Sequence, residues 1–252
     1  MTMIIIGALV LLVSATLLAW LARRASARAE AFAEVPRYDC AQVAEHGEAA
    51  PGMRVSVSGR AEPGAKPLTA PASGRECVWY RLVISERHRE VHRDSKGNTR
   101  PRIVERQVSE ERSHDAFAVA DASGRVLVDP DGADIDDPVE TVDRVESVSS
   151  GAGMNLSLGT FTFNIGGSSS LVGVRTREHI LPVGEELYAL AGAGQRDGHA
   201  VLGRPNEGAF VVSTRSSDEL EKRARRVMWA WTAAVFLGSA AGAALIVGGL
   251  MS

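Results

Sequence analysis

The last apolar run of this chain, residues 227–251, limits what the sequence can fold into more than any other feature, because its 25 residues include no charged side chain. An α-helix rises about 1.5 Å per residue, so a helix of this length exceeds the roughly 30 Å hydrocarbon core of a bilayer. Trp229 and Trp231 stand near its beginning, and indole rings favour the membrane interface. We therefore predict a transmembrane α-helix over residues 227–251.

A basic segment, residues 217–226, precedes this run, and Ser217 is a suitable N-cap for a short juxtamembrane helix. Its cationic side chains, which we expect to flank the membrane, are Lys222, Arg223, Arg225 and Arg226. Within the span, Gly238 and Gly242 stand four residues apart among other small residues, a pattern that lets a second helix approach closely. The alternative is that glycine and alanine are simply frequent in this chain.

Residues 1–22 form a second uncharged run, followed by Arg23, Arg24 and Arg28. A secretory signal peptide carries its charges before the apolar run, so we expect an uncleaved transmembrane helix, with cleavage after it as the alternative. Both basic flanks face the middle of the chain. The positive-inside rule then places residues 23–226 in the cytoplasm and both termini outside.

The segment between the two runs predicts a mainly β, barrel- or sandwich-like soluble domain. Residues 23–52 read as a linker and a short helix, with Asp39 as the N-cap and Gly47 as the stop. From residue 53 to 216 helical patterns are scarce and short alternating runs are frequent. The run 77–84 has apolar residues on both faces, so we expect it to be the most central strand.

Charged residues dominate the segment 85–114, with Lys96, Gly97 and Asn98 at its middle, which predicts two long strands joined by a turn. Acidic and basic side chains would pair across such a hairpin. It is either a solvated charged ribbon or a ribbon that docks a partner. Shorter strands are expected at 116–120 and 125–128, and 61–74 reads as a loop.

Glycine and serine fill residues 149–170, yet this segment also contains Leu156, Leu158, Phe161, Phe163 and Ile165. It predicts a flexible insert, either a slack hairpin or a mobile segment that contacts lipid or a partner. Residues 172–212 then return to short strands separated by proline and glycine.

No catalytic, cofactor-binding or metal-binding residues are predicted. Cys40 and Cys77 are isolated, so they cannot form a structural zinc site alone, and two reduced, partly buried thiols are favoured over a disulfide. Cys77 lies in an apolar strand that should raise its pKa, whereas Cys40 lies near a helix start that should lower it. His88 and His92 lack the helical context of a zinc protease. The net charge of −3, without a basic stripe, argues against nucleic-acid binding.

The acidic segment 129–137 is a further candidate metal site, for Ca²⁺. Its aspartates resemble the ligands of an EF-hand loop, but Ala133 replaces a ligand and Gly132 comes too early. Calcium binding is therefore disfavoured.

Several stretches together resemble the membrane-anchored RING E3 ubiquitin ligases of the MULAN/GIDE family and their bacterial and archaeal relatives. They are Gly59-Arg60, the segment 68–71, Cys77-Val78-Trp79-Tyr80-Arg81, the segments 117–121 and 175–184, Leu187 to Gly192, and the helix from Ser217 into the second span. The resemblance implies a β-rich BAM/GIDE domain over 53–216, between the two spans. It also suggests a bacterial cell membrane as the location.

The same resemblance implies ubiquitin-ligase activity in a RING that follows the second span. We expect no RING here, because two zinc sites need about eight ligands at paired spacings and the chain has only 2 cysteines and 6 scattered histidines. The leading expectation is a membrane-tethered, non-catalytic binding or scaffold module. Its partners would be the lipid bilayer and either another protein or a second copy, through the transmembrane helices.

Three alternatives remain open. The first is a ubiquitin-ligase-like transferase, as the family name implies. The second is a hydrolase built around His114, Asp115 and Glu178. The third is an accessory subunit of a membrane protease or transporter, paired through Gly238 and Gly242.

Overall fold

The computed structural model of the protein describes residues 35–93, 99–149, 151–216, 219 and 222. Residues 37–206 and 210–214 form one compact unit, described below. Both predicted spans, 1–22 and 227–251, lie outside the described residues, as do Gly238 and Gly242 and every predicted flanking residue except the exposed Lys222. None of the helices in the described part is long and apolar enough to cross a bilayer.

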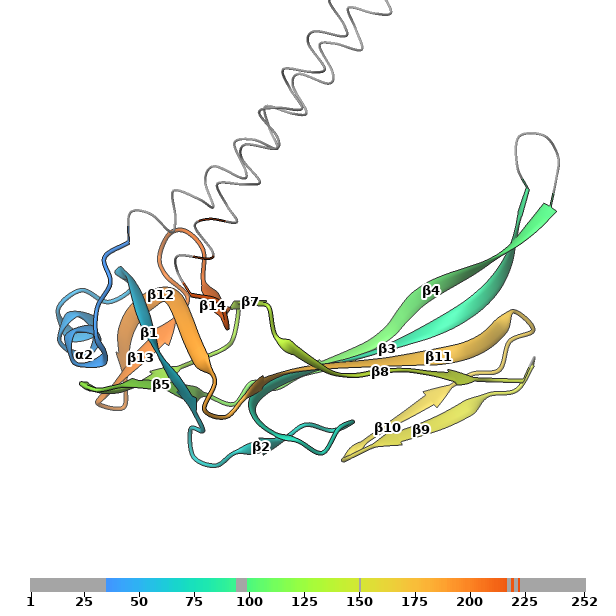
Figure 1. Ribbon diagram of the computed structural model, residues 1–252, viewed down its shortest axis with the longest axis horizontal. Helices are drawn as coiled ribbons and strands as arrows, with labels where there is room; N and C mark the ends of the chain where they lie inside the picture. The colour runs from blue at the N-terminus through green and yellow to red at the C-terminus, as the bar shows by residue number, and fades with distance from the viewer. Residues whose placement is uncertain (1–34, 94–98, 150, 217–218, 220–221, 223–252) are drawn as a thin grey trace, which may run out of the picture. The chain divides into compact units, whose positions relative to one another are not determined.

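Five strands close into a barrel. They are β1 (Arg54–Glu62), β5 (Phe117–Asp121), β6 (Gly124–Val128), β12 (Glu186–Arg196) and β13 (His199–Gly203). β1 pairs with β5 on one edge and with β12 on the other, β5 and β6 form a hairpin, and β12 and β13 form another. A parallel pair, β13 with β6, completes the ring. The prediction of a mainly β, barrel-like domain is therefore confirmed (Figure 1), and the ring has the five-stranded Greek-key character of OB-fold barrels.

Alternation along the barrel strands explains their packing. Val55 and Val57 of β1 and Val126 and Val128 of β6 point into one shared core, because every second residue of a strand faces the same side. The short strands β7 (Asp134–Asp136) and β14 (Val211–Ser213) extend the sheet beside β12. β7 lies within the acidic segment 129–137.

The predicted short helix is α2 (Cys40–Ala49). Asp39 is its N-cap, as expected: the Asp39 side chain accepts from the Gln42 backbone N–H, and the Gln42 side chain accepts from the Asp39 N–H. The helix does not stop at Gly47, which instead packs against β12. A Cβ atom at Gly47 would lie 2.8 Å from the Gly194 carbonyl oxygen, so this glycine permits close packing.

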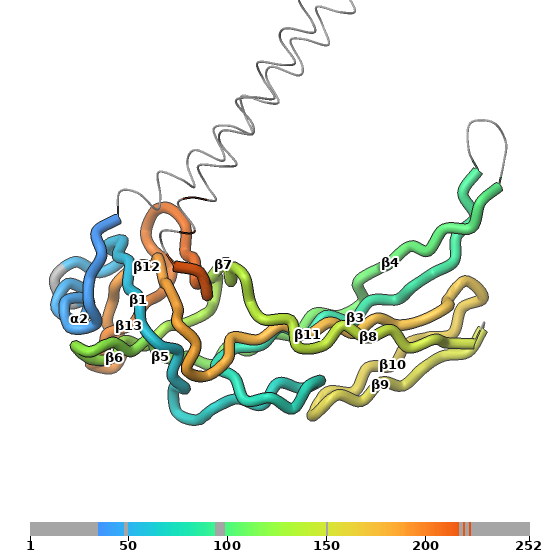
Figure 2. Tube along the Cα trace, viewed as in Figure 1, coloured from blue at the N-terminus to red at the C-terminus, as the bar shows by residue number. Residues whose placement is uncertain are grey.

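A second sheet is built from two insertions into the barrel. One insertion, between β1 and β5, supplies β2 (Leu68–Thr69), β3 (Glu76–Arg93) and β4 (Thr99–Arg112), and the other, between β6 and β12, supplies β8 (Val139–Ser147) and β11 (Leu171–Pro182). Figure 2 shows β3, β4, β8 and β11 running side by side, as their pairings require. The short β2 lies within the segment predicted to be a loop.

β3 links the barrel to this sheet. Val78 and Trp79 pack in the barrel core, and Leu82 and Ile84 pack in the core of the second sheet. The expectation that residues 77–84 form a central strand is therefore correct. The predicted pair of long strands around Lys96–Asn98 is also confirmed, as β3 and β4.

The predicted insert 149–170 contains a hairpin, β9 (Met154–Leu158) and β10 (Phe161–Ile165). Leu156, Leu158 and Ile165 are buried against the second sheet, while Phe161 and Phe163 stack with their centroids 6.3 Å apart. Of the two alternatives, the hairpin is the one observed, and its flexibility stays a prediction. The expectation of only short strands over 172–212 is wrong, since β11 and β12 have 12 and 11 residues.

Candidate functional site: a cleft at the end of β4

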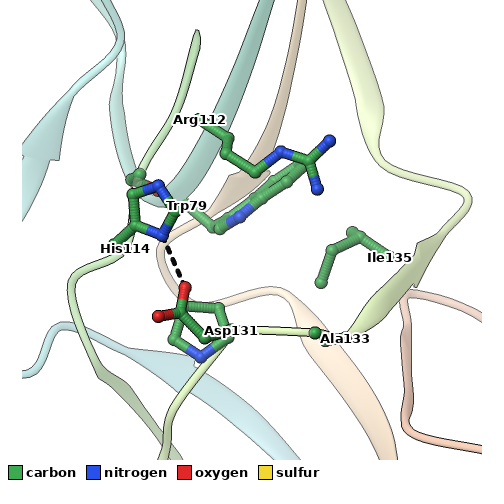
Figure 3. Close-up of a pocket in the computed structure, with 9 residues that line it drawn as sticks. Trp79, Arg112, His114, Asp131, Ala133 and Ile135 are labelled. Atoms are coloured by element: carbon green, nitrogen blue, oxygen red, sulfur yellow. Dashed lines mark hydrogen bonds and ion pairs between the residues drawn. The ribbon is translucent and has the colours of Figure 1, made fainter. Parts of the chain in front are cut away.

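A cleft of about 330 Å³ lies where β4 ends and the chain returns to the barrel. Trp79 of β3 forms part of its wall, and Arg112, Ser113 and His114 follow one another along the end of β4. The segment 130–135, which follows β6 and runs into β7, supplies the opposite wall with Asp131 and Ile135 (Figure 3). Only the tertiary fold brings these two segments together.

A hydrogen bond joins His114 and Asp131 across this cleft, drawn as a dashed line in Figure 3. The His114 Nδ1 atom lies 2.5 Å from Asp131 Oδ1, and both side chains are about two-thirds exposed, at 67% and 64%. An exposed pair of this kind contributes little to stability. It does fix the imidazole at the mouth of the cleft.

Ser113, which lies beside His114 in the sequence, is not an activated nucleophile. Its side chain is buried, and its Oγ atom accepts a hydrogen bond from the Tyr80 backbone N–H at 3.1 Å. The Ser113 N–H in turn donates to the Tyr80 carbonyl. A nucleophilic serine needs a base within hydrogen-bond reach, and the polar contact of His114 is with Asp131 instead.

Arg112 supplies the cationic side of the cleft. Its guanidinium donates to Glu110, which also accepts a hydrogen bond of 3.1 Å from Arg81. Partial burial alone would raise the pKa of Glu110, but the hydrogen bonds from Arg81 and Arg112 lower that pKa to about 2. Glu110 is therefore ionised at neutral pH and holds Arg112 at the cleft wall.

The three residues of the hydrolase hypothesis are not brought together. His114 pairs with Asp131 in the first cleft. Asp115 lines a different cleft, of about 650 Å³, on the outer face of the barrel with Lys66, Arg125 and His199.

Glu178 is fully buried in β11, where its carboxylate accepts hydrogen bonds from the Ala72 N–H at 2.6 Å, the Ser73 N–H at 3.1 Å and the Thr141 hydroxyl at 2.7 Å. These bonds tie the turn before β3 to the second sheet. The three residues of the hydrolase hypothesis therefore do not form one site.

The two cysteines are free and buried, so the prediction of reduced thiols agrees with the structure. Burial and the nearby Glu178 raise the pKa of the Cys77 thiol to about 11, in the expected direction. The expectation for Cys40 is wrong: burial and the neighbouring Asp121 raise its pKa to about 12, which outweighs its place at the start of α2. Its Sγ atom donates to the Val119 carbonyl.

The metal candidates do not assemble within the described residues, where no group of three or more His, Cys, Asp or Glu side chains is placed to hold an ion. In the acidic segment, Asp129 pairs with Arg196 at 2.7 Å and Asp131 with His114. His88 is buried, with Nε2 2.8 Å from Glu86 and Nδ1 2.9 Å from Ser170. These contacts join the start of β11 to β3.

Sequence reasoning missed Trp79, Arg112 and Asp131 as members of one site. The motif containing Trp79 predicts only a strand and a family resemblance. Nothing in the local pattern indicates that residues 130–135 return to the end of β4, so no sequence signal was available for that contact.

The fold and this cleft define a class: a closed β-barrel carrying a second sheet, with a cleft where β4 returns to the barrel. A family model described as GIDE, E3 ubiquitin ligase, matches residues 86–247, which is more than half of the chain. The chain belongs to the GIDE family. Comparisons with curated proteins and with solved structures found no match.

Proposed function

We propose that this chain is a membrane-tethered, non-catalytic binding module of the GIDE family, which presents the cleft at Arg112 and His114 to a protein partner. One observation carries the proposal. The cleft gathers tryptophan, arginine and histidine side chains, while the neighbouring Ser113 hydroxyl is occupied by the Tyr80 N–H. Tryptophan and arginine are enriched among residues that dominate the energetics of protein interfaces.

The chemistry of the cleft favours an acidic or polar side chain of the partner. Arg112 offers a guanidinium held in place by Glu110, and Ile135 together with the small exposed edge of Trp79 offers an apolar wall. Such a cleft binds through one anchored side chain surrounded by weaker contacts. Catalysis by covalent ubiquitin transfer would instead need a reactive thiolate, and burial keeps Cys40 and Cys77 protonated at neutral pH.

The proposed setting is a bacterial cell membrane, with the two apolar runs 1–22 and 227–251 as spans and the β domain on the cytoplasmic side. The support is the distribution of basic residues, which flank both runs on their inner sides. Tethering at both ends would hold the cleft close to partners in the same membrane and raise their effective concentration.

The test combines an activity assay with site-specific crosslinking. The purified full chain, incubated with ubiquitin and its activating and conjugating enzymes, should build no ubiquitin chains. A photo-crosslinker at His114 in native membranes should capture a discrete partner, and Arg112→Ala should reduce that product, whereas a crosslinker at the exposed His199 should not form it. Ubiquitin-chain formation by the chain alone would contradict the proposal, as would equal crosslinking from both positions.

A further inference from the structure

The outer half of the β3–β4 hairpin extends beyond the rest of the second sheet. β11 pairs with β3 only as far as His88, while β3 and β4 continue to pair with each other out to Arg93 and Thr99. Figure 1 shows this ribbon rising away from β8 and β11. We call residues 89–93 and 99–103 the outer ribbon.

Charge is balanced at the base of this ribbon. On one face of the sheet, Glu105 of β4 pairs with Arg87 of β3 at 3.3 Å and with Arg175 of β11 at 3.1 Å. Arg175 also pairs with Asp143 of β8 at 2.5 Å. These ion pairs cross four strands and match arginines with carboxylates.

The same face changes character in the outer ribbon. Residues directly opposite each other in an antiparallel pair share a face, so this face carries the pairs Arg89 with Ile103, Val91 with Pro101, and Arg93 with Thr99. It contains no acidic residue. Glu90, which is the one acidic residue among positions 89–93 and 99–103, lies on the opposite face and pairs with Arg106 at 2.5 Å.

Apolar side chains stand exposed at the centre of this acid-free face. Val91 is 70% exposed and Ile103 is 41% exposed, and they are diagonal neighbours across the two strands. Val91 is the most exposed large apolar side chain among the described residues. Arg89 and Arg93 stand on either side of Val91 along β3.

We infer that this face of the outer ribbon binds an anionic phospholipid surface, with Val91 and Ile103 entering the interface and the arginines contacting headgroup phosphates. Arginine keeps its charge in the headgroup layer while its aliphatic stem covers apolar surface, and a few cations near an anionic membrane give substantial attraction. Arg100 and Arg102 on the opposite face add to that attraction. The inference rests on the proposed membrane tether, which keeps the ribbon near lipid.

An added peptide strand is the competing occupant, since β4 pairs only with β3 among the described strands. Pro101 has no backbone N–H to donate, and proline is one of the devices that protect an edge strand from further pairing. The exposed pattern also lies on the face of the ribbon, not along its edge. Both points favour a surface that meets the face, as a bilayer does.

The experiment uses the full chain with a polarity-sensitive fluorophore on an introduced cysteine. Ile103→Cys reports on the ribbon, and Val183→Cys, whose native side chain is also 41% exposed but lies outside the ribbon, is the matched control. Both native thiols are buried, so labelling is selective. The chain is mixed with vesicles of pure phosphatidylcholine or of phosphatidylcholine with phosphatidylglycerol, some carrying a lipid-bound quencher.

We expect the lipid-bound quencher to reach the label at 103 only when phosphatidylglycerol is present. The label at 183 should remain in water in both vesicle types. Arg89→Glu and Arg93→Glu, each made singly, should lower the fraction of chains whose label at 103 contacts lipid by at least about fivefold. Arg204→Glu on the barrel should leave this fraction unchanged. Quenching of the label at 103 by an aqueous quencher alone, in both vesicle types, would overturn the inference.

Flotation separates this inference from the membrane tether. If the chains float with both vesicle types but the label at 103 remains in water, the tether is supported and the ribbon inference is overturned. Chains that float only with anionic vesicles, with the label in lipid, support the ribbon and contradict the tether. No flotation with either contradicts both. If polyglutamate shifts the emission of the label at 103 and anionic vesicles do not, the ribbon binds an acidic polypeptide and the lipid inference is wrong.

Discussion

At the scale of single residues, Glu178 and the two cysteines are ionisable groups that the fold buries. The Glu178 carboxylate lies at the centre of the second sheet and accepts hydrogen bonds from three residues. A buried carboxylate is tolerated only when such donors replace water. This explains why an acidic residue stands in the middle of an otherwise packed strand.

Glu178→Gln should destabilise the protein. The amide is neutral and replaces one acceptor oxygen by an NH₂ group that must face the backbone N–H of Ala72 or Ser73, so a charge-assisted hydrogen bond is lost, at a cost of about 1–3 kcal/mol. Thermal unfolding followed by circular dichroism should show a lower midpoint. Glu140→Gln is the control, because the Glu140 side chain is 52% exposed and pairs loosely with His179 at 3.7 Å. Equal effects of the two substitutions would contradict this account of Glu178.

The cysteine thiols should be inert in the folded protein. Their pKa values of about 12 and about 11 exceed the ordinary value of 9.0, so almost no thiolate exists at pH 8. We expect iodoacetamide to modify Cys40 and Cys77 slowly until the protein is unfolded by urea. Rapid modification of either thiol in the folded state would show that it is neither buried nor protonated as described.

The same pKa values set a pH dependence. Because each folded pKa lies above the unfolded value of 9.0, the contribution of the thiols to the free energy of unfolding is complete below pH 9.0 and declines as pH rises toward 11–12. The stability of Cys77→Ala should therefore fall less steeply above pH 9.0 than that of the native sequence, in urea unfolding measured across that range.

At the scale of secondary structure elements, β12 is the strand that makes the barrel possible. It pairs with β1 on one edge and with both β14 and β13 on the other. Gly192 lies where the neighbour of β12 on this edge changes from β14 to β13. A Cβ atom at Gly192 would stand 2.7 Å from Pro205 Cα and 3.1 Å from the Arg204 carbonyl oxygen. The glycine lets the segment after β13 cross close to β12.

Gly192→Ala should destabilise the barrel by about 1–3 kcal/mol, because the backbone of residues 204–205 must move to admit the methyl group. Gly203→Ala is the matched control: Gly203 is the cross-strand partner of Gly192, and a Cβ atom built there meets nothing within 4 Å. Chemical unfolding of the two variants under the same conditions gives the comparison. Similar stabilities would indicate that the crossing segment yields easily.

At the scale of the whole molecule, membership in the GIDE family is shown by the match over residues 86–247. The matched segment includes residues 112–114 and 130–135 of the cleft, the strands β4, β8 and β11 of the second sheet, and residues 227–247 of the last apolar run. The cleft and the outer ribbon are separate surfaces of one domain, so binding of a protein partner and contact with lipid are compatible.

The orientation in the membrane can be tested directly. Cysteines introduced at Thr2 and Ser252 should react with a membrane-impermeant maleimide in intact cells, and one at Asn98 should react only after the cells are opened. The reason is that the basic residues on the inner sides of both apolar runs favour the cytoplasm. Labelling at Asn98 alone in intact cells would reverse the proposed topology.

The sequence by itself determined what depends on local pattern. Alternation predicted β3 as a central strand, Asp39 as an N-cap predicted the start of α2, and the turn residues at 96–98 predicted the long hairpin of β3 and β4. These features depend on neighbours within a few residues, and so a window of sequence contains the information. The family resemblance is likewise a property of the sequence.

Only the tertiary structure decided how distant segments meet. It joined β6 to β13 in the parallel pair that closes the barrel and brought Asp131 to His114. It also buried Cys40 and placed Asp121 beside it, so that the pKa of the thiol rises instead of falling. Finally, it made β11 and β12 long strands where only short strands were expected. The physical reason is that burial, long-range pairing and electrostatic neighbours arise from contacts between residues far apart in the chain, which no local pattern records.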